Sequence, residues 1–137
     1  MDREFKVIAA IADVHIGNKA ISWKEYKHQL KKGVIEKLEQ MTFLDMIVLC
    51  GDTLHCQISM NSDYSSVFFW FIGKVVKIAK KKNAAVRVIK GTRSHDLDQL
   101  DTIKFYEDDP EIDFAVIDDY MIETIDGLNY AYIAENY

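Results

Sequence analysis

Three short runs of the chain are apolar at nearly every position. They cover Phe5–Ala12, Phe43–Cys50 and Ala85–Ile89, and Val and Ile recur within them. A strand that is covered on both faces has this pattern, whereas a half-exposed strand alternates between apolar and polar residues. The pattern therefore predicts three buried strands of a parallel sheet.

Two helical patterns lie between these strands. The first begins with the capping sequence Ser22–Glu25 and continues to Met41, with apolar residues three or four positions apart. The second is expected to begin near Asn61 or Ser62 and to end in the lysine cluster Lys80–Lys82, where positive charge suits the carboxyl end of a helix. Alternating strands and helices predict two right-handed crossovers, which bring the ends of the strands to one edge of the sheet.

The last third of the chain has a different pattern. A short helix is compatible with Asp98–Tyr106, and strands are predicted over Phe114–Ile117 and Tyr120–Ile125. Asp126-Gly127 is a hairpin signal that leads into a further strand over Leu128–Ala134. The predicted fold class is α/β: a parallel βαβαβ half of a sandwich, followed by the first antiparallel strands of a second sheet.

The composition is that of one globular domain, spanning residues 1–137. Hydrophobic residues make up 49% of the chain and charged residues 28%, and there is one proline. The net charge of −5 provides no strong basic field for nucleic acid, so a phosphate substrate would need metal ions or a local patch. The chain has two cysteines, and it shows neither a signal-peptide pattern nor an apolar stretch that would span a bilayer. These features predict a cytoplasmic protein without membrane contact.

Carboxylate and imidazole side chains follow each of the three predicted strands. In chain order these residues are Asp13, His15, Asp52, His55, His95 and Asp96. Because the strands end at one edge of the sheet, we expect these side chains to converge there. Carboxylate oxygens and imidazole nitrogens together suit a transition metal such as Mn²⁺, Fe²⁺ or Zn²⁺. The alternative, three polar turns that cap a sheet without binding a metal, stays open at this point.

The order of these motifs resembles that of the calcineurin-like metallophosphoesterases. Within this family, Gly51–His55 is most similar to the nuclease subunit of the bacterial and phage double-strand-break repair exonuclease. The resemblance implies that Asp13 and His15 bind the first metal ion and that Asp52 bridges two ions. The expected cofactor is Mn²⁺, as one or two ions.

The resemblance also implies roles for the residues around the metal. His55 would lie close to the substrate phosphate, His95 would assist the leaving group or stabilise the transition state, and Asp96 would orient His95. The family's third motif has an Asn between the glycine and the histidine, where this chain has Thr92-Arg93-Ser94. Two substitutes for this Asn stay open: Arg93 binds the phosphate through its charge, or Ser94 is a weak metal ligand.

The resemblance covers only the first half of the family's catalytic domain. The second half supplies further metal-binding histidines in the family, and no histidine follows His95 in this chain. We therefore expect a partial domain that holds half of a dinuclear site. The expected activity is metal-dependent phosphodiester hydrolysis, as in a DNA repair exonuclease or endonuclease.

Two alternatives remain at this stage: an inactive truncated or split relative that acts as a binding or regulatory module, and a nucleotide phosphatase. The partners that the resemblance implies are DNA and, in a full-length protein, an ATPase subunit with a long coiled coil. The large side chains of Phe69 and Trp70 on one side of the second helix predict a homodimer.

Overall fold

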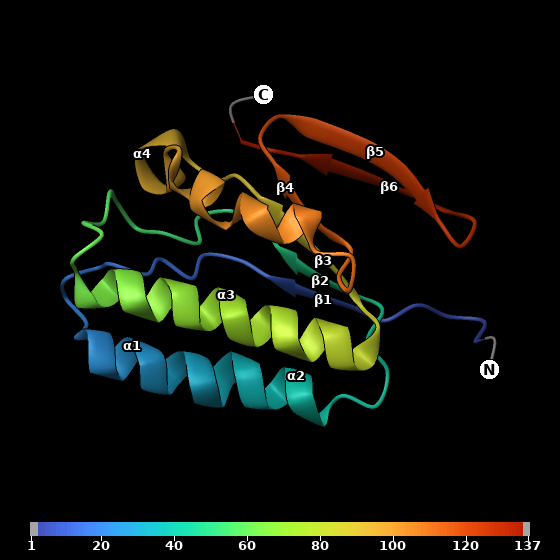
Figure 1. Ribbon diagram of the computed structural model, residues 1–137, viewed down its shortest axis with the longest axis horizontal. Coiled ribbons are helices and arrows are strands. Elements are labelled where there is room, and N and C mark those ends of the chain that lie inside the picture. Colours follow the sequence, from blue (N-terminus) through green and yellow to red (C-terminus); the bar gives the residue numbers. More distant parts are fainter. Residues whose placement is uncertain (1–2, 136–137) are drawn as a thin grey trace.

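A four-stranded parallel sheet lies at the centre of the structure, a computed structural model that describes residues 3–135 (Figure 1). Its strands follow one another in space as they do in the sequence, and each neighbouring pair is parallel. They are β1 (Ile8–Ile11), β2 (Met46–Leu49), β3 (Ala85–Ile89) and β4 (Phe114–Ile117). The three predicted parallel strands are confirmed, although β1 and β2 are shorter than the apolar runs that contain them.

One helical layer connects β1 to β2. It consists of α1 (Trp23–Leu30), a π-helical segment η1 (Lys31–Ile35) and α2 (Glu36–Gln40), which follow one another without a break. The hydroxyl of Ser22 accepts a hydrogen bond of 3.2 Å from the backbone N–H of Glu25, which confirms the predicted start of the helix.

The second crossover helix is α3 (Asp63–Lys82), which covers the same face of the sheet as α1 and α2 (Figure 1). Ser62 caps its first turn, and Asn83 ends it in the left-handed conformation, with a φ of 54°. Its predicted apolar stripe is buried against the sheet and consists of Phe68, Phe71, Ile72, Val75 and Ala79. Within residues 3–135, no helix combines the length and the apolar character that crossing a membrane requires.

The connection from β3 to β4 holds two further helical segments, α4 (Arg93–Asp96) and the 3₁₀ helix η2 (Gln99–Asp108). The helix predicted near Asp98–Tyr106 is thus present in 3₁₀ form. The strand at Phe114–Ile117 corrects the prediction that placed it in the antiparallel layer, because it pairs with β3 in the parallel sheet. The helical crossover returns the chain to the same direction as β3, and parallel pairing requires this.

A hairpin covers the other face of the sheet (Figure 1). It is formed by β5 (Tyr120–Ile125) and β6 (Leu128–Ile133), which pair in antiparallel fashion. Asp126 and Gly127 both have positive φ, 50° and 80°, as expected for the tight turn that their sequence predicted. The predicted second sheet is therefore present as two antiparallel strands.

The first strand is less buried than its sequence predicted. β1 lies at the edge of the sheet, and 45% of the Ile8 side chain is exposed. The core beneath the hairpin is built on β2, β3 and β4 instead, from Met46, Val48, Ala85, Ile117 and Tyr132. The apolar run identified a strand correctly, but it does not show that both faces of that strand are covered.

A buried ion pair joins the hairpin to the sheet. Arg87 in β3 is only 2% exposed, and its guanidinium donates to both carboxylate oxygens of Glu123 in β5, at 2.8 and 3.0 Å. Asp113 accepts a further bond from Arg87 at 2.9 Å, and the hydroxyl of Tyr132 donates to Glu123 at 2.8 Å. Because of the Arg87 guanidinium in particular, the pKa of Glu123 lies below its ordinary value.

We expect Glu123→Gln to lower the free energy of unfolding by about 1–3 kcal/mol at pH 7, since Arg87 then keeps only Asp113 as a charged partner. Because the pKa of Glu123 is lower in the folded state than its ordinary value of about 4.5, the ionised carboxylate stabilises the fold at pH values above 4.5. This stabilisation is lost as the pH falls through the pKa of the folded state. The stability difference between wild type and variant should therefore shrink as the pH falls from 6 to 3. Urea unfolding at several pH values measures this, and a constant difference would contradict it.

Candidate metal centre

The loops that follow β1 and β2 continue the parallel pairing of these strands. The backbone N–H of His15 donates to the carbonyl of Asp52 at 3.0 Å, and that of Asp13 donates to the carbonyl of Gly51 at 3.3 Å. Tyr26 in α1 holds the same loop from the helical side, with its hydroxyl donating to the carbonyl of His15 at 2.5 Å. The positions of Asp13, His15 and Asp52 are thus coupled by backbone hydrogen bonds.

All three of these residues adopt left-handed backbone conformations. Their φ angles are 56° at Asp13, 52° at His15 and 50° at Asp52. This conformation is uncommon for residues with a side chain, and each case costs on the order of 1–3 kcal/mol. Such conformations are concentrated at binding and catalytic sites, where they direct side chains that an ordinary turn would not bring together.

The side chains of these residues converge as the sequence predicted. Nε2 of His15 lies 3.8 Å from Oδ1 of Asp13 and 3.8 Å from Oδ2 of Asp52. One ligand atom from each residue can be chosen so that all three lie within 4.8 Å of one another. Because first-row metals bind such atoms at about 2.0–2.2 Å, two ligands of one ion lie at most about 4.4 Å apart. The two distances of 3.8 Å lie within this limit.

The histidines of the second and third motifs complete the cluster. His55 and His95 also have ring nitrogens within 4.8 Å of a ring nitrogen of His15, and the Nδ1 atoms of His15 and His55 are 3.3 Å apart. Nδ1 of His95 lies 3.1 Å from Oδ2 of Asp52, but the ring is not aligned for a hydrogen bond. This buried nitrogen therefore has no hydrogen-bond partner among the described residues, although it faces the cluster.

Thr92 positions the carboxylate of Asp52. Its backbone N–H donates to Oδ1 at 2.6 Å, and its hydroxyl lies 3.2 Å from Oδ2. Partial burial acts to raise the pKa of Asp52, but the bonds from Thr92 and the proximity of His95 outweigh it, so that the pKa is lowered. The carboxylate is therefore held as an anion, the form that binds a metal ion.

Glu135 is a neighbour of the site that the sequence analysis did not identify. Its carboxylate accepts a hydrogen bond of 2.9 Å from the Thr92 hydroxyl. A cleft of about 200 Å³ beside the cluster is lined by Glu135 together with Asp13 and Asp52. Glu135 lies 43 residues after Thr92 and follows the hairpin, so no local sequence pattern connects it to the three motifs.

Asp96 lies beneath the site rather than beside the ring of His95, which it was expected to orient. It is fully buried, and its carboxylate accepts hydrogen bonds from the backbone N–H groups of Gly91 (2.7 Å), Leu54 (2.9 Å) and Asp52 (3.1 Å). Burial raises the pKa of Asp96, although the N–H groups of Leu54 and Gly91 act against this. Its contacts thus join the second and third loops to each other.

The second and third loops also meet through a glycine. A Cβ atom at Gly91 would overlap the backbone nitrogen and the Oδ1 atom of Asp52. Only glycine allows this approach, so the glycine of the third motif brings Thr92 within reach of the Asp52 carboxylate.

Arg93 is placed outside the cluster. It is the exposed first residue of α4 and lines a neighbouring cleft of about 320 Å³ together with Lys90, Asp98 and Asp118. The structure therefore brings together five of the seven residues predicted for the site, leaving Asp96 beneath it and Arg93 at its margin.

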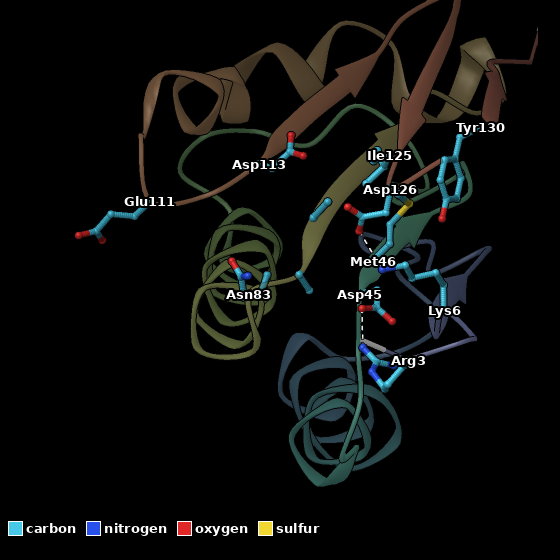
Figure 2. A pocket seen from close by; sticks show the side chains of 13 residues that line it. Arg3, Lys6, Asp45, Met46, Asn83, Glu111, Asp113, Ile125, Asp126 and Tyr130 are labelled. Atoms are coloured by element: carbon cyan, nitrogen blue, oxygen red, sulfur yellow. Dashed lines mark hydrogen bonds and ion pairs between the residues drawn. The ribbon is translucent and has the colours of Figure 1, made fainter. Parts of the chain in front are cut away.

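A larger cleft, of about 590 Å³, lies at the opposite edge of the sheet (Figure 2). Met46 and Ala85, the first residues of β2 and β3, line it, whereas the side chains of the candidate cluster follow the other ends of these strands. Lys6 pairs with Asp126 at 2.8 Å within it, and the guanidinium of Arg3 lies 2.6 Å from Asp45 (Figure 2). The basic side chains of this cleft thus already have acidic partners.

The donor set of the cluster fits a divalent transition metal. It combines two carboxylates with imidazole nitrogens, one of which is buried without a hydrogen-bond partner among residues 3–135. Comparison of the chain with family models and with curated proteins gives no match.

Proposed function

We propose that this chain binds a divalent metal ion through Asp13, His15 and Asp52 and hydrolyses phosphodiesters. The observation that carries the proposal is the convergence of these three side chains, from two separate loops, to within 4.8 Å of one another. A divalent ion held there would supply a Lewis acid for the phosphoryl oxygen and lower the pKa of water. Mn²⁺ is the ion we propose, since it accepts both carboxylate and imidazole ligands.

The remaining side chains of the cluster suggest how a phosphate group would be handled. His55 and His95 stack with their ring centroids 5.5 Å apart, and both lie beside His15. In their protonated forms they would donate hydrogen bonds to phosphate oxygens, where negative charge develops in the transition state. Arg93, at the margin, would bind a neighbouring phosphate of a longer substrate.

The substrate class we propose is DNA, which follows from the resemblance of Gly51–His55 to repair nucleases. Self-association through α3 also remains a proposal. Phe69 is 36% exposed, as such a contact requires, but Trp70 is half-buried, and the ammonium group of Lys27 lies 5.2 Å from its ring centroid.

The proposal is tested by assaying hydrolysis of bis-p-nitrophenyl phosphate and of linear duplex DNA with Mn²⁺. We expect turnover that EDTA abolishes and that a His95→Ala variant lowers by about 10²–10⁴-fold, the usual contribution of a proton-transferring or charge-stabilising side chain. His28→Ala, on the exposed surface of α1, is the matched control and should retain wild-type activity. Metal binding without turnover of either substrate would instead favour the binding or regulatory module. Hydrolysis of nucleotide monoesters alone would favour the phosphatase.

A further inference from the structure

The charges of this acidic protein are strongly segregated. The helical layer formed by α1, η1, α2 and α3 carries ten lysines and four acidic residues. Residues 96–135 carry thirteen acidic residues and a single basic one, Lys104. Although the net charge of the chain is −5, the helical layer on one face of the sheet is therefore positively charged.

A groove between α2 and α3 concentrates this positive charge. It has a volume of about 300 Å³ and is lined by Glu39, Lys74, Lys77, Ile78, Lys81 and Lys82. Lys74, Lys77 and Lys81 are three and four positions apart, so they follow one face of α3 over about 10 Å. This length matches about three phosphate-to-phosphate steps of one strand, each of which advances by about 3.4 Å along the axis of a duplex.

Three lysines of the groove have no carboxylate partner among the described residues. Within the described part of the chain, Lys74, Lys77 and Lys81 form no ion pair, and Glu39 is the one carboxylate among the lining residues. Lys80, in the same helix but not lining the groove, lies 2.7 Å from Asp109 and 3.6 Å from Glu111. The ammonium groups of Lys74, Lys77 and Lys81 are thus available to an external anion, whereas that of Lys82 donates to the carbonyl of Met41 at 2.6 Å.

We propose that this groove, defined by Lys74, Lys77 and Lys81, binds the phosphate backbone of a nucleic acid duplex. It lies at the carboxyl end of α3, whereas the metal centre lies beyond the opposite ends of the helices. The groove would therefore hold a segment of duplex away from the metal centre and without reading its sequence. The proposal rests on the charge distribution and stands independently of catalysis.

An anionic membrane surface is the competing occupant, and the surroundings of the groove disfavour it. Helices that bind membranes expose large apolar side chains beside their basic residues. None of the residues that line the groove is an exposed large apolar side chain, and the nearest such residues in the sequence, Phe43 and Phe69, do not line it. The surface around the groove is thus suited to purely electrostatic contacts, which the backbone of a nucleic acid makes.

The test measures binding of a fluorescein-labelled 20-base-pair DNA duplex by fluorescence anisotropy in EDTA, between 50 and 200 mM KCl. Without metal there is no cleavage, so this result is independent of the proposed hydrolysis. We expect the triple variant Lys74→Gln, Lys77→Gln, Lys81→Gln to bind at least tenfold more weakly at 50 mM salt. The slope of log K against log salt should fall in magnitude by about 2–3, because each lost phosphate contact contributes about 0.9.

The matched control replaces Lys6, Lys80 and Lys104 with glutamine, which removes the same charge from lysines that are already ion-paired. It should bind within about twofold of the wild type, and replacing the three groove lysines with arginine should preserve binding. The proposal is overturned if the two triple glutamine variants lose binding equally, or if the variant of the groove lysines loses none. It is also overturned if the wild type binds phosphatidylserine vesicles but not DNA.

Discussion

Exchanging Asp52 for asparagine is expected to weaken Mn²⁺ binding by roughly a hundredfold or more, since loss of a supporting contact alone typically costs 10–100-fold. Asp52 has the most contacts in the cluster: Nε2 of His15 lies 3.8 Å from it and Nδ1 of His95 lies 3.1 Å from it. The backbone N–H of Thr92 donates to its Oδ1, and the Thr92 hydroxyl lies 3.2 Å from its Oδ2. An amide at this position keeps the size of the side chain but removes the charge. Isothermal titration calorimetry with MnCl₂ measures the change.

Asp98→Asn provides the control for this variant. Asp98 is also an aspartate of the third loop region, but its side chain is 92% exposed and pairs with Lys90 outside the cluster. We expect Asp98→Asn to bind Mn²⁺ with wild-type affinity. Equal affinities of the Asp52 variant and the wild type would show that the bound ion lies elsewhere.

Replacing Asp96 with alanine is expected to cost about 3–5 kcal/mol of folding free energy. The variant leaves the backbone N–H groups of Gly91, Leu54 and Asp52 without the acceptor that they share, and each unpaired buried donor costs about 1–3 kcal/mol. Urea unfolding monitored by circular dichroism measures the loss. Because the same contacts join the second and third loops, Mn²⁺ binding should also weaken.

Two further variants show whether these contacts are the cause. Asp96→Asn keeps one oxygen acceptor and should lose less stability than Asp96→Ala. Asp98→Ala, on the exposed surface two residues further on, should change the free energy of unfolding by no more than about 0.5 kcal/mol. If Asp96→Ala were as stable as Asp98→Ala, the buried carboxylate would not hold the two loops together.

The sequence predicted the sheet and its helices well because their signals are local. The apolar runs, the Ser22 cap and the stripe on α3 are each visible within one element. The partner of Phe114–Ile117 is not a local property, because a short apolar strand looks the same in a parallel or an antiparallel sheet. Here the crossover through η2 determines its direction, and a 3₁₀ helix has a weaker periodic signal than an α-helix.

The candidate site was predictable to the extent that its residues follow strands. Asp13, His15 and Asp52 converge because parallel strands end at one edge, and that rule requires no knowledge of side-chain packing. The place of Asp96 depends on which backbone N–H groups it meets when the loops fold over one another. The contact between Glu135 and Thr92 depends on the path of the whole hairpin. Neither arrangement has a signature in the neighbouring sequence.

The most direct test of the metal centre is the location of Mn²⁺ in crystals grown with MnCl₂, from anomalous diffraction at the manganese absorption edge. We expect a peak enclosed by the carboxylates of Asp13 and Asp52 and the imidazole of His15, about 2.0–2.3 Å from each ligand atom. A peak held by the histidines alone, or no peak while Asp13 and Asp52 point apart, would contradict the account.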